Sequence, residues 1–154
     1  MAYSTRVLSF SFSGRSAAAP AGLTAQVSLP RCQANEPDIK ESRGGLRDSV
    51  LVSALAASWL ADRPHGQYDD AVERLLDVRD CIHLVANKDT NMLLAPYQAR
   101  VSAMLGLADP TLPSGEREAK SIDDLQTLLA RVGRQIAFSL DSTASRAEHS
   151  LTHE

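Results

Sequence analysis

The feature that most constrains the fold of this chain is a helical repeat of apolar residues, which returns in four stretches between residues 48 and 146. Within each stretch, apolar residues recur at spacings of three and four, and this spacing places them on one face of an α-helix. Proline and glycine separate the stretches and interrupt helices. The pattern predicts an all-α fold, a small antiparallel bundle of about four helices with short connectors.

The four expected helices differ in how much of their surface is apolar. We expect them at about residues 48–61, 69–87, 94–105 and 121–145. Asp48 or Ser49 is a suitable cap for the first helix and Ser121 for the fourth, and Gly106 is suited to end the third. The apolar set of the first helix is so broad that we expect this helix to be largely buried; its members are Val50, Leu51, Val52, Leu55, Trp59 and Leu60.

Composition excludes several classes of function. The formal net charge is −3 and the pI is about 5.8, so the chain lacks the basic surface of a nucleic-acid-binding protein. No apolar run approaches the roughly 20 residues that cross a bilayer. The only cysteines are Cys32, in a loop-like stretch, and Cys81, which suits a small buried thiol. A disulfide is not favoured, and we expect a cytoplasmic, reducing compartment without a membrane or nucleic-acid partner.

The first 34 residues differ in composition from the rest of the chain. They are rich in Ser and Ala, contain Arg6, Arg15 and Arg31, and contain no acidic residue. An organellar presequence, a secretory signal and a poorly ordered extension all fit such a stretch, and we favour the extension. Residues 6–13 alternate like a strand and are suited to pack on a partner surface. We therefore expect an extension at 1–34, a helical domain at 35–146 and a frayed tail at 147–154.

Most signatures of a catalytic or metal site are missing. We find no phosphate-binding P-loop, dinucleotide fingerprint, nucleophile elbow or zinc-protease motif. The four histidines are scattered, and His83 lies among apolar neighbours, where a hydrogen-bonded boundary histidine is more common than a metal ligand. We assign no catalytic residue and no metal ligand to this chain.

One segment, NEPDIKESRGGLRD at residues 35–48, has the composition of a phosphate-binding loop. Cations surround a glycine pair directly before an expected helix, where free backbone amides and the helix dipole favour anions. The residues we assign to phosphate are Lys40, Arg43, Gly44, Gly45 and Arg47. The alternative is a tight turn made possible by Gly-Gly, with the cations offset by neighbouring acidic residues.

The same segment resembles a motif of the bacterial PII uridylyltransferases, P-x-[IL]-K-E-x-x-G-G-L-R-D. The stretches LLDVRDCIHLVANKDTNMLLAPYQARVSAMLGLAD and SIDDLQTLLARVGRQIAFSLDSTASR are similar to later helices of that family. The resemblance covers roughly residues 35–146. Glutamine synthetase adenylyltransferases have a related G-G-[IL]-R-D segment, but Lys40-Glu41 favours the PII enzymes. Ser42 departs from the family pattern, in which glycine is common at this position.

The resemblance implies a helical segment that follows a nucleotidyltransferase core. The family's enzymes transfer a nucleotidyl group from UTP, or from ATP in some actinobacterial relatives, to the PII signalling protein in nitrogen regulation. An Asp-x-Asp pair in the core holds Mg²⁺. Residues 1–34 contain no aspartate, so we expect a truncated member that is inactive alone.

On this hypothesis, Lys40, Arg43 and Arg47 face nucleotide phosphates, and Gly44 and Gly45 allow close approach. Asp48 caps the first helix or orients Arg47. The expected partners are PII, UTP or ATP, and either the missing catalytic core or a second copy of the chain. Two alternatives stay open: a non-catalytic helical interaction module that binds or regulates a nucleotidyltransferase, and a gene remnant without function.

Overall fold

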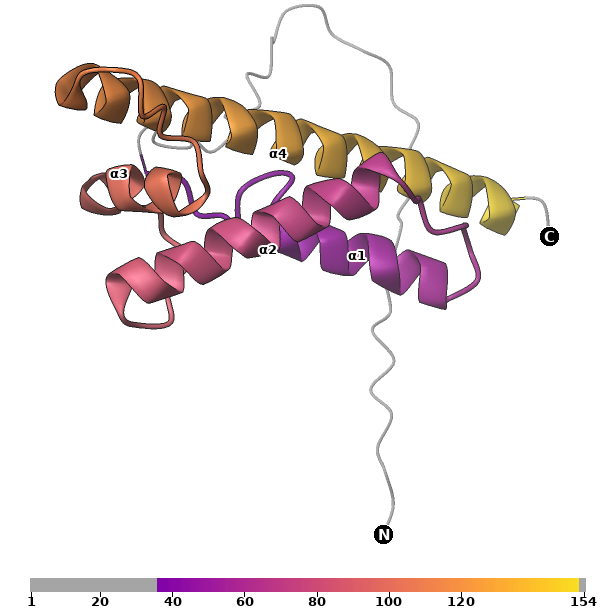
Figure 1. Ribbon diagram of the computed structural model, residues 1–154. Helices are drawn as coiled ribbons and strands as arrows, with labels where there is room; N and C mark the ends of the chain where they lie inside the picture. The colour runs from indigo at the N-terminus through magenta and orange to yellow at the C-terminus, as the bar shows by residue number, and fades with distance from the viewer. Residues whose placement is uncertain (1–35, 153–154) are drawn as a thin grey trace, which may run out of the picture.

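The computed structural model describes residues 36–152, which form four α-helices without a strand. In chain order (Figure 1) the helices are α1 Leu46–Ala57, α2 Gln67–Ala86, α3 Ala95–Met104 and α4 Ser114–Thr152. The predicted all-α fold of about four helices is confirmed. The expectations for residues 1–34 lie outside the described residues. Within the described part of the chain, no helix is both long and apolar enough to cross a membrane.

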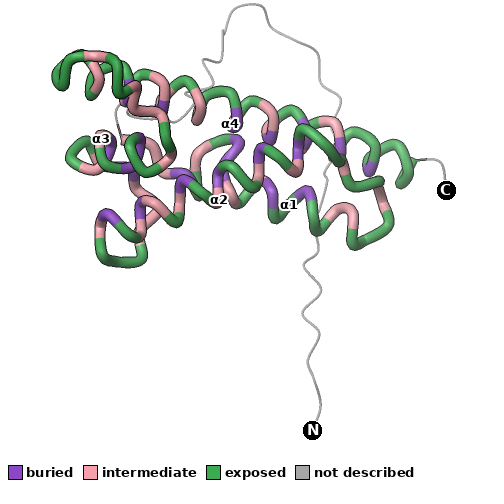
Figure 2. The backbone as a smooth tube through the Cα atoms, in the orientation of Figure 1, coloured by how far each residue is buried: buried purple, intermediate pink, exposed green. Residues whose placement is uncertain are grey.

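The long helix α4 organises the other three. It has 39 residues, which corresponds to roughly 58 Å at the helical rise of 1.5 Å per residue, and it contacts α1, α2 and α3 in turn. Figure 1 shows the three shorter helices on one side of α4, with α2 running opposite to both α1 and α4. Buried residues follow the side of α4 that faces them (Figure 2).

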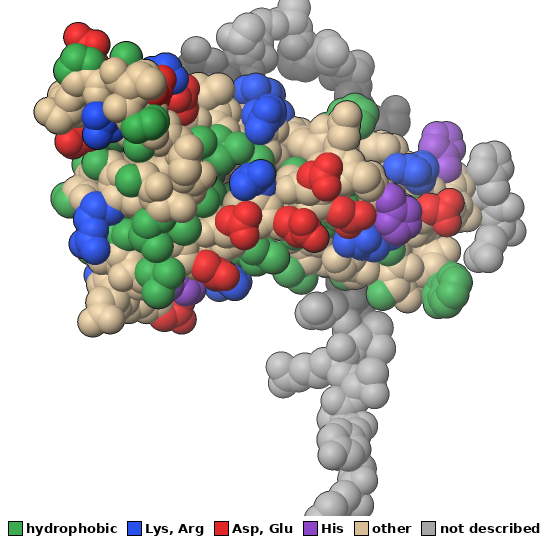
Figure 3. Space-filling view, viewed as in Figure 1, with side chains coloured by type: hydrophobic (Ala, Val, Ile, Leu, Met, Phe, Trp, Pro, Cys, Tyr) green, Lys and Arg blue, Asp and Glu red, His purple; other side chains and the backbone are tan. Residues whose placement is uncertain are grey.

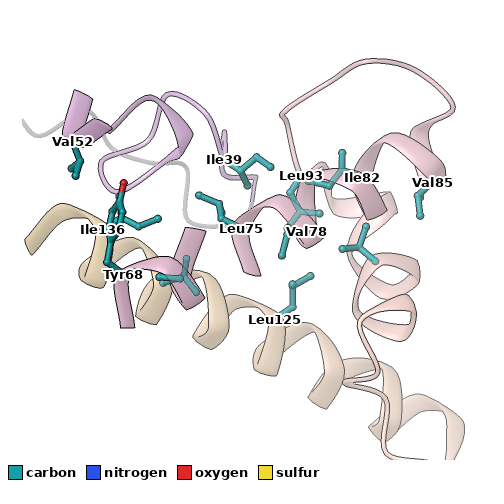
Figure 4. Packing of buried hydrophobic residues seen from close by; sticks show 13 residues of the cluster. Ile39, Val52, Tyr68, Leu75, Val78, Ile82, Val85, Leu93, Leu125 and Ile136 are labelled. Atoms are coloured by element: carbon teal, nitrogen blue, oxygen red, sulfur yellow. The ribbon is translucent and has the colours of Figure 1, made fainter. Parts of the chain in front are cut away.

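The core lies between α4 and the shorter helices (Figure 4). Its largest fully buried side chains are Tyr68, Ile82, Leu93, Leu125 and Ile136. Tyr68 comes from the first turn of α2, and its hydroxyl donates a 3.2 Å hydrogen bond to the Ser49 carbonyl of α1. Burial raises the pKa of Tyr68 above its ordinary value. This tyrosine therefore joins α1 and α2 by both packing and a hydrogen bond.

A short backbone pairing holds the start of the described chain against the connector between α2 and α3. Ile39 donates from its amide to the Asn91 carbonyl and Leu93 donates to the Pro37 carbonyl, both at 3.0 Å. The Ile39 and Leu93 side chains are buried in the core. The Glu36 carboxylate accepts from the Ala95 amide at 3.1 Å, which satisfies one of the free donors at the start of α3. The sequence does not predict this pairing.

The predicted burial of α1 is wrong. The helix begins at Leu46 and ends at Ala57, earlier at both ends than expected. It buries only Ser49 and Val52, while Val50, Leu51 and Trp59 are 66%, 47% and 95% exposed. Ser49 tolerates burial because its hydroxyl donates to the Leu46 carbonyl at 2.7 Å. The side of α1 that contacts α4 and Tyr68 is therefore the one with Ser49 and Val52, not the one with its larger apolar residues.

The fourth helix is longer than predicted at both ends. It begins at Ser114, where the sequence indicated a loop up to Lys120, and it continues to Thr152, past the point where fraying was expected. The Arg117 guanidinium donates to the carbonyls of Leu112 and Pro110 and holds the connector against the first turn. Ser121 is not a cap. It is buried, and its hydroxyl lies 2.9 Å from that of Ser102 in α3.

Replacing Tyr68 with Phe is expected to lower the free energy of unfolding by about 1 kcal/mol near neutral pH, because one buried hydrogen bond is lost. The raised pKa makes the difference depend on pH. The folded state holds the phenol proton more tightly than the unfolded state, so the stabilisation by Tyr68 is lost as the pH rises beyond about 10. Urea unfolding followed by circular dichroism measures both effects.

The matched control is Tyr97→Phe, since no hydrogen bond of the Tyr97 hydroxyl is found among residues 36–152. An equal loss of stability in both variants would contradict the role assigned to the Tyr68 hydrogen bond.

Candidate functional site

The loop before α1 folds back on itself. The Asp38 carboxylate accepts from the amides of Lys40 and Glu41 at 2.8 and 3.0 Å, and the Asp38 carbonyl accepts from the Ser42 amide at 3.0 Å. An aspartate that bonds to the backbone two residues ahead stabilises a turn. We call residues 38–45 the GG loop. Its conformation is held by its own backbone and by Asp38.

The first four backbone amides of α1 donate hydrogen bonds to carbonyl groups of the GG loop. Leu46 donates to the Ile39 carbonyl at 3.0 Å and Arg47 donates to the Lys40 carbonyl at 3.1 Å. The next two amides, of Asp48 and Ser49, donate to the Gly45 carbonyl at 3.1 and 3.4 Å. A helix N-terminus binds an anion through amides that lack an acceptor. Here all four amides already have one.

The two glycines are required by close packing. Gly44 is buried with φ +77°, and a Cβ added there would lie 1.9 Å from the Gly133 carbonyl oxygen of α4. A Cβ on Gly45 would lie 2.7 Å from the carbonyl oxygens of both Lys40 and Ser42. The amide of Gly44 donates to the Asp48 carboxylate at 2.6 Å, and that of Gly45 donates to the Ser42 carbonyl at 2.7 Å. Gly44 therefore serves the contact between the GG loop and α4, and Gly45 serves the tight turn within the loop.

Asp48 was predicted to cap α1, but it lies in the first turn, three residues inside the N-cap position. The residue before the helix is Gly45. The Asp48 carboxylate reaches back to the Gly44 amide and fastens the loop to the helix, as an acidic residue in the first turn often does. The Arg47 guanidinium pairs with Glu41 at 2.9 Å, and no ion pair between Asp48 and Arg47 is found among residues 36–152.

The three predicted cations reach the surface. Lys40 is exposed, and no ion pair of its ammonium group is found among the described residues. Arg43 donates to the Asp141 carboxylate of α4 at 2.6 Å, with both side chains more than 60% exposed. The pair between Arg47 and Glu41 is also open to solvent. In the GG loop, the two glycines are therefore buried, while the side chains of Lys40 and Arg43 are exposed to solvent.

Two clefts lie elsewhere on the bundle. One of about 560 Å³ runs between α2 and α4 and is lined by Asp70, Glu73, Asp77, Arg74 and Arg131 among others. Figure 3 shows acidic side chains in a row across this face. The second, of about 830 Å³, lies where the connector after α1 meets the end of α4. No residue of the GG loop lines either cleft, so a ligand on the cations would lie on an open surface.

The described residues do not form a Mg²⁺ site. No group of three or more His, Cys, Asp or Glu side chains in residues 36–152 is arranged to hold a metal ion. His83 lies 3.3 Å from Asp89, which is almost fully exposed. Cys81 is a half-buried thiol whose pKa is raised, first by burial and then by Asp77 and Asp80.

Two α4 residues at this site were not predicted from the sequence, namely Gly133 and Asp141. A glycine inside a helix costs about 1 kcal/mol relative to alanine, so the presence of Gly133 in a helical pattern was a usable signal of close backbone approach. Asp141 gave no such signal, because an acidic residue on a solvated helix face is common. Its pairing with Arg43 depends on how α4 lies across the loop.

Comparison with known proteins confirms the resemblance to the PII uridylyltransferases. A family model described as GlnD PII-uridylyltransferase matches residues 49–137. The bifunctional uridylyltransferase/uridylyl-removing enzyme of Streptomyces coelicolor is 53% identical over 74 residues, which make up 48% of this chain and 9% of the relative. The enzyme of the same name from Mycobacterium tuberculosis is 35% identical over 127 residues, which make up 77% of this chain and 14% of the relative.

The similarity covers a small part of these relatives, between 9% and 14% of their length. No solved structure matches the chain. The match to the family model begins after Gly45, so it concerns the helices. Phosphate binding by the GG loop stays a prediction.

Replacing Gly44 with Ala is expected to lower the free energy of unfolding by about 3 kcal/mol, since it combines a strained positive φ with a clash against the α4 backbone. Gly115→Ala is the control, because a Cβ there meets nothing within 4 Å. Chemical unfolding should show that this control is neutral or slightly stabilised. A tolerated Gly44→Ala would mean that the loop does not pack on Gly133.

Proposed function

The chain belongs to the GlnD PII-uridylyltransferase family, and from this premise we propose that it is the non-catalytic part of a nucleotidyltransferase, contacting the phosphates of the nucleotide. Its relatives are named bifunctional uridylyltransferase/uridylyl-removing enzymes. The reaction we propose for the assembled enzyme is transfer of UMP from UTP, or AMP from ATP, to the PII signalling protein in nitrogen regulation. The observation that supports this proposal is the exposure of three cations, Lys40 and Arg43 in the GG loop and Arg47 at the start of α1.

The cations are of the right kind and lie on a rigid support. A guanidinium group donates to two phosphate oxygens at once, while an ammonium group acts as a point charge. Arg43 and Lys40 project from a loop whose backbone bonds to itself, and Arg47 follows in the first turn of α1. A loop held this way loses little entropy when a ligand binds, and preorganisation of this kind favours affinity.

The acidic partners of the two arginines do not prevent binding. Exposed ion pairs contribute about 0–1 kcal/mol, and both pairs, with Asp141 and with Glu41, are exposed. A triphosphate carries more charge than one carboxylate, so it competes well for the guanidinium groups. The glycine amides already have internal acceptors. We therefore assign phosphate contact to side chains alone, with Gly44 and Gly45 as the packing support.

In the proposed enzyme, this chain binds the nucleotide phosphates and another unit supplies the catalytic groups. The described residues bind and orient negative charge, and they lack a carboxylate group arranged for a metal. Mg²⁺ bound elsewhere would neutralise the triphosphate and orient the attacking oxygen. We infer that the carboxylates holding it belong to a catalytic unit outside residues 36–152, and that this chain is inactive alone.

A second candidate function is a helical interaction module that binds or regulates a nucleotidyltransferase. The observation that favours it is the exposed outer side of α1, where Val50, Leu51 and Trp59 face solvent. Contiguous exposed apolar side chains often mark interfaces. The partner would be the catalytic unit or a second copy of the chain.

UTP binding to the purified chain should depend on Arg43 of the GG loop and on Arg47 in the first turn of α1. We expect Arg43→Ala and Arg47→Ala each to weaken binding about tenfold, or about 1.4 kcal/mol, because each removes a charge-assisted pair with phosphate. Isothermal titration calorimetry at low ionic strength measures this effect, which added salt should reduce. Arg100→Ala, on the exposed surface of α3, is the control. Equal affinities in all three variants would exclude the GG loop as the phosphate site.

The chain alone is expected to transfer no nucleotide. The assay follows labelled UMP or AMP from UTP or ATP to PII in the presence of Mg²⁺, with the purified full chain as the sole enzyme. Any turnover above the rate without protein would show that the catalytic carboxylates are present in this chain, contrary to the proposal.

A further inference from the structure

The outer side of α1 is an apolar surface without a partner in residues 36–152. We define the α1 face as Val50, Leu51, Ala54, Ala57 and Trp59, all of them exposed. The first four lie on one side of the helix because their spacings are close to whole turns. In the space-filling view, hydrophobic side chains reach the surface along α1 (Figure 3). Such a face is costly to leave in water.

Trp59 is the most unusual member of the α1 face. It is the only tryptophan in the chain, it is 95% exposed, and its φ is +60°. A left-handed backbone is unfavourable for a bulky residue, and the strain here is not offset by packing of the indole within the described residues. The cleft beside it is lined by apolar side chains and by polar or charged ones, namely Ala56, Leu60, Ala61, Asp62, Arg63, Arg146, His149 and Ser150. The surface therefore offers an indole ring beside a hollow with one apolar and one polar side.

A stretch of the same chain has the matching pattern. In residues 7–12, Leu8, Phe10 and Phe12 alternate with serines, so an extended conformation places all three on one side. From Leu8 to Phe12 an extended chain spans roughly 13 Å, and from Val50 to Ala57 the helix spans roughly 10 Å. The apolar edge of this stretch and the α1 face are therefore of similar length.

The connection is long enough for contact within one molecule. Twenty-three residues separate Phe12 from Glu36, and their extended length of roughly 80 Å exceeds the roughly 58 Å of α4. Charge favours the approach of this segment to the bundle as a whole. The whole chain has a net charge of −3, and residues 1–34 contain three arginines and no acidic residue, so the remainder has a net charge of −6. The cleft beside Trp59 is lined by Arg63 and Arg146 as well as Asp62, so charge does not select this face.

We propose that residues 7–12 dock on the α1 face of their own chain, with a phenylalanine ring against Trp59. The covalent connection supports this occupant over a second copy, because a tether gives the docking segment a local concentration in the millimolar range. Burial of the apolar edge against α1 removes both surfaces from water. A partner protein that uses the α1 face must first displace this segment.

Trp59 fluorescence in the full chain tests the proposal. Docking shields the indole, so its emission is blue-shifted and acrylamide quenches it slowly, at every protein concentration. The double variant Phe10→Ser/Phe12→Ser should shift the emission to the red and raise the quenching constant severalfold. Val50→Ser/Leu51→Ser, on the other side of the contact, should do the same. Circular dichroism should show unchanged helix content in both variants.

The control is Ser9→Asn/Ser11→Asn, which changes the opposite side of the extended stretch and should leave the fluorescence unchanged. Rapid quenching in the unmodified chain, equal to that of Phe10→Ser/Phe12→Ser, would show that nothing covers Trp59. Shielding that disappears on dilution would assign the face to a second copy. Either outcome overturns the proposal.

Discussion

The structure depends on one close contact between backbones, that of Gly44 with Gly133. The loop before α1 reaches the surface of α4 because Gly44 has no side chain. A Cβ on Gly44 would lie 1.9 Å from the Gly133 carbonyl oxygen, whereas a Cβ on Gly133 would meet the Arg43 carbonyl oxygen at an ordinary contact distance of 3.6 Å. This approach places Arg43 beside Asp141, and it sets the side of α1 that faces the bundle. A rigid support for the cations and the inward position of Ser49 both follow from it. A side chain on Gly44 would separate the loop from the helix.

The backbone and the side chains of the GG loop have different roles. Its glycines and its amides bond and pack within the bundle, while its cations remain on the surface. A basic loop with paired glycines before a helix is a common pattern for phosphate, yet here the backbone half of that pattern is already used. Only the exposed cations are available to a ligand, and the loop backbone that supports them is held by internal hydrogen bonds. Such a surface is suited to complete a site whose reactive groups come from another unit.

Burial could be predicted from the sequence where a helix has a single apolar stripe. The face of α2 that includes Leu75, Val78 and Ile82 follows the expected spacing and forms the core. For α1 the pattern was ambiguous, because apolar residues occupy most of its circumference. Periodicity then does not choose a side. The buried side of α1 is the one with the smaller residues Ser49 and Val52, because smaller side chains allow α1 to pack closely against α4.

Sequence alone determined that this chain forms helices and roughly where they lie, because apolar periodicity and turn formers are local properties of the chain, and its motifs indicated the family. The caps predicted at Asp48 or Ser49 and at Ser121 were wrong, since α1 and α4 begin earlier. The sequence also located the cations, since their positions follow from a motif. Only the tertiary structure decided that the glycine amides bond internally, that Arg43 meets Asp141, and that α1 turns its large apolar side chains outward. The pair of Arg43 and Asp141 joins residues 98 positions apart, and the orientation of α1 depends on its packing against α4 and Tyr68. No local pattern specifies which surfaces of two helices meet.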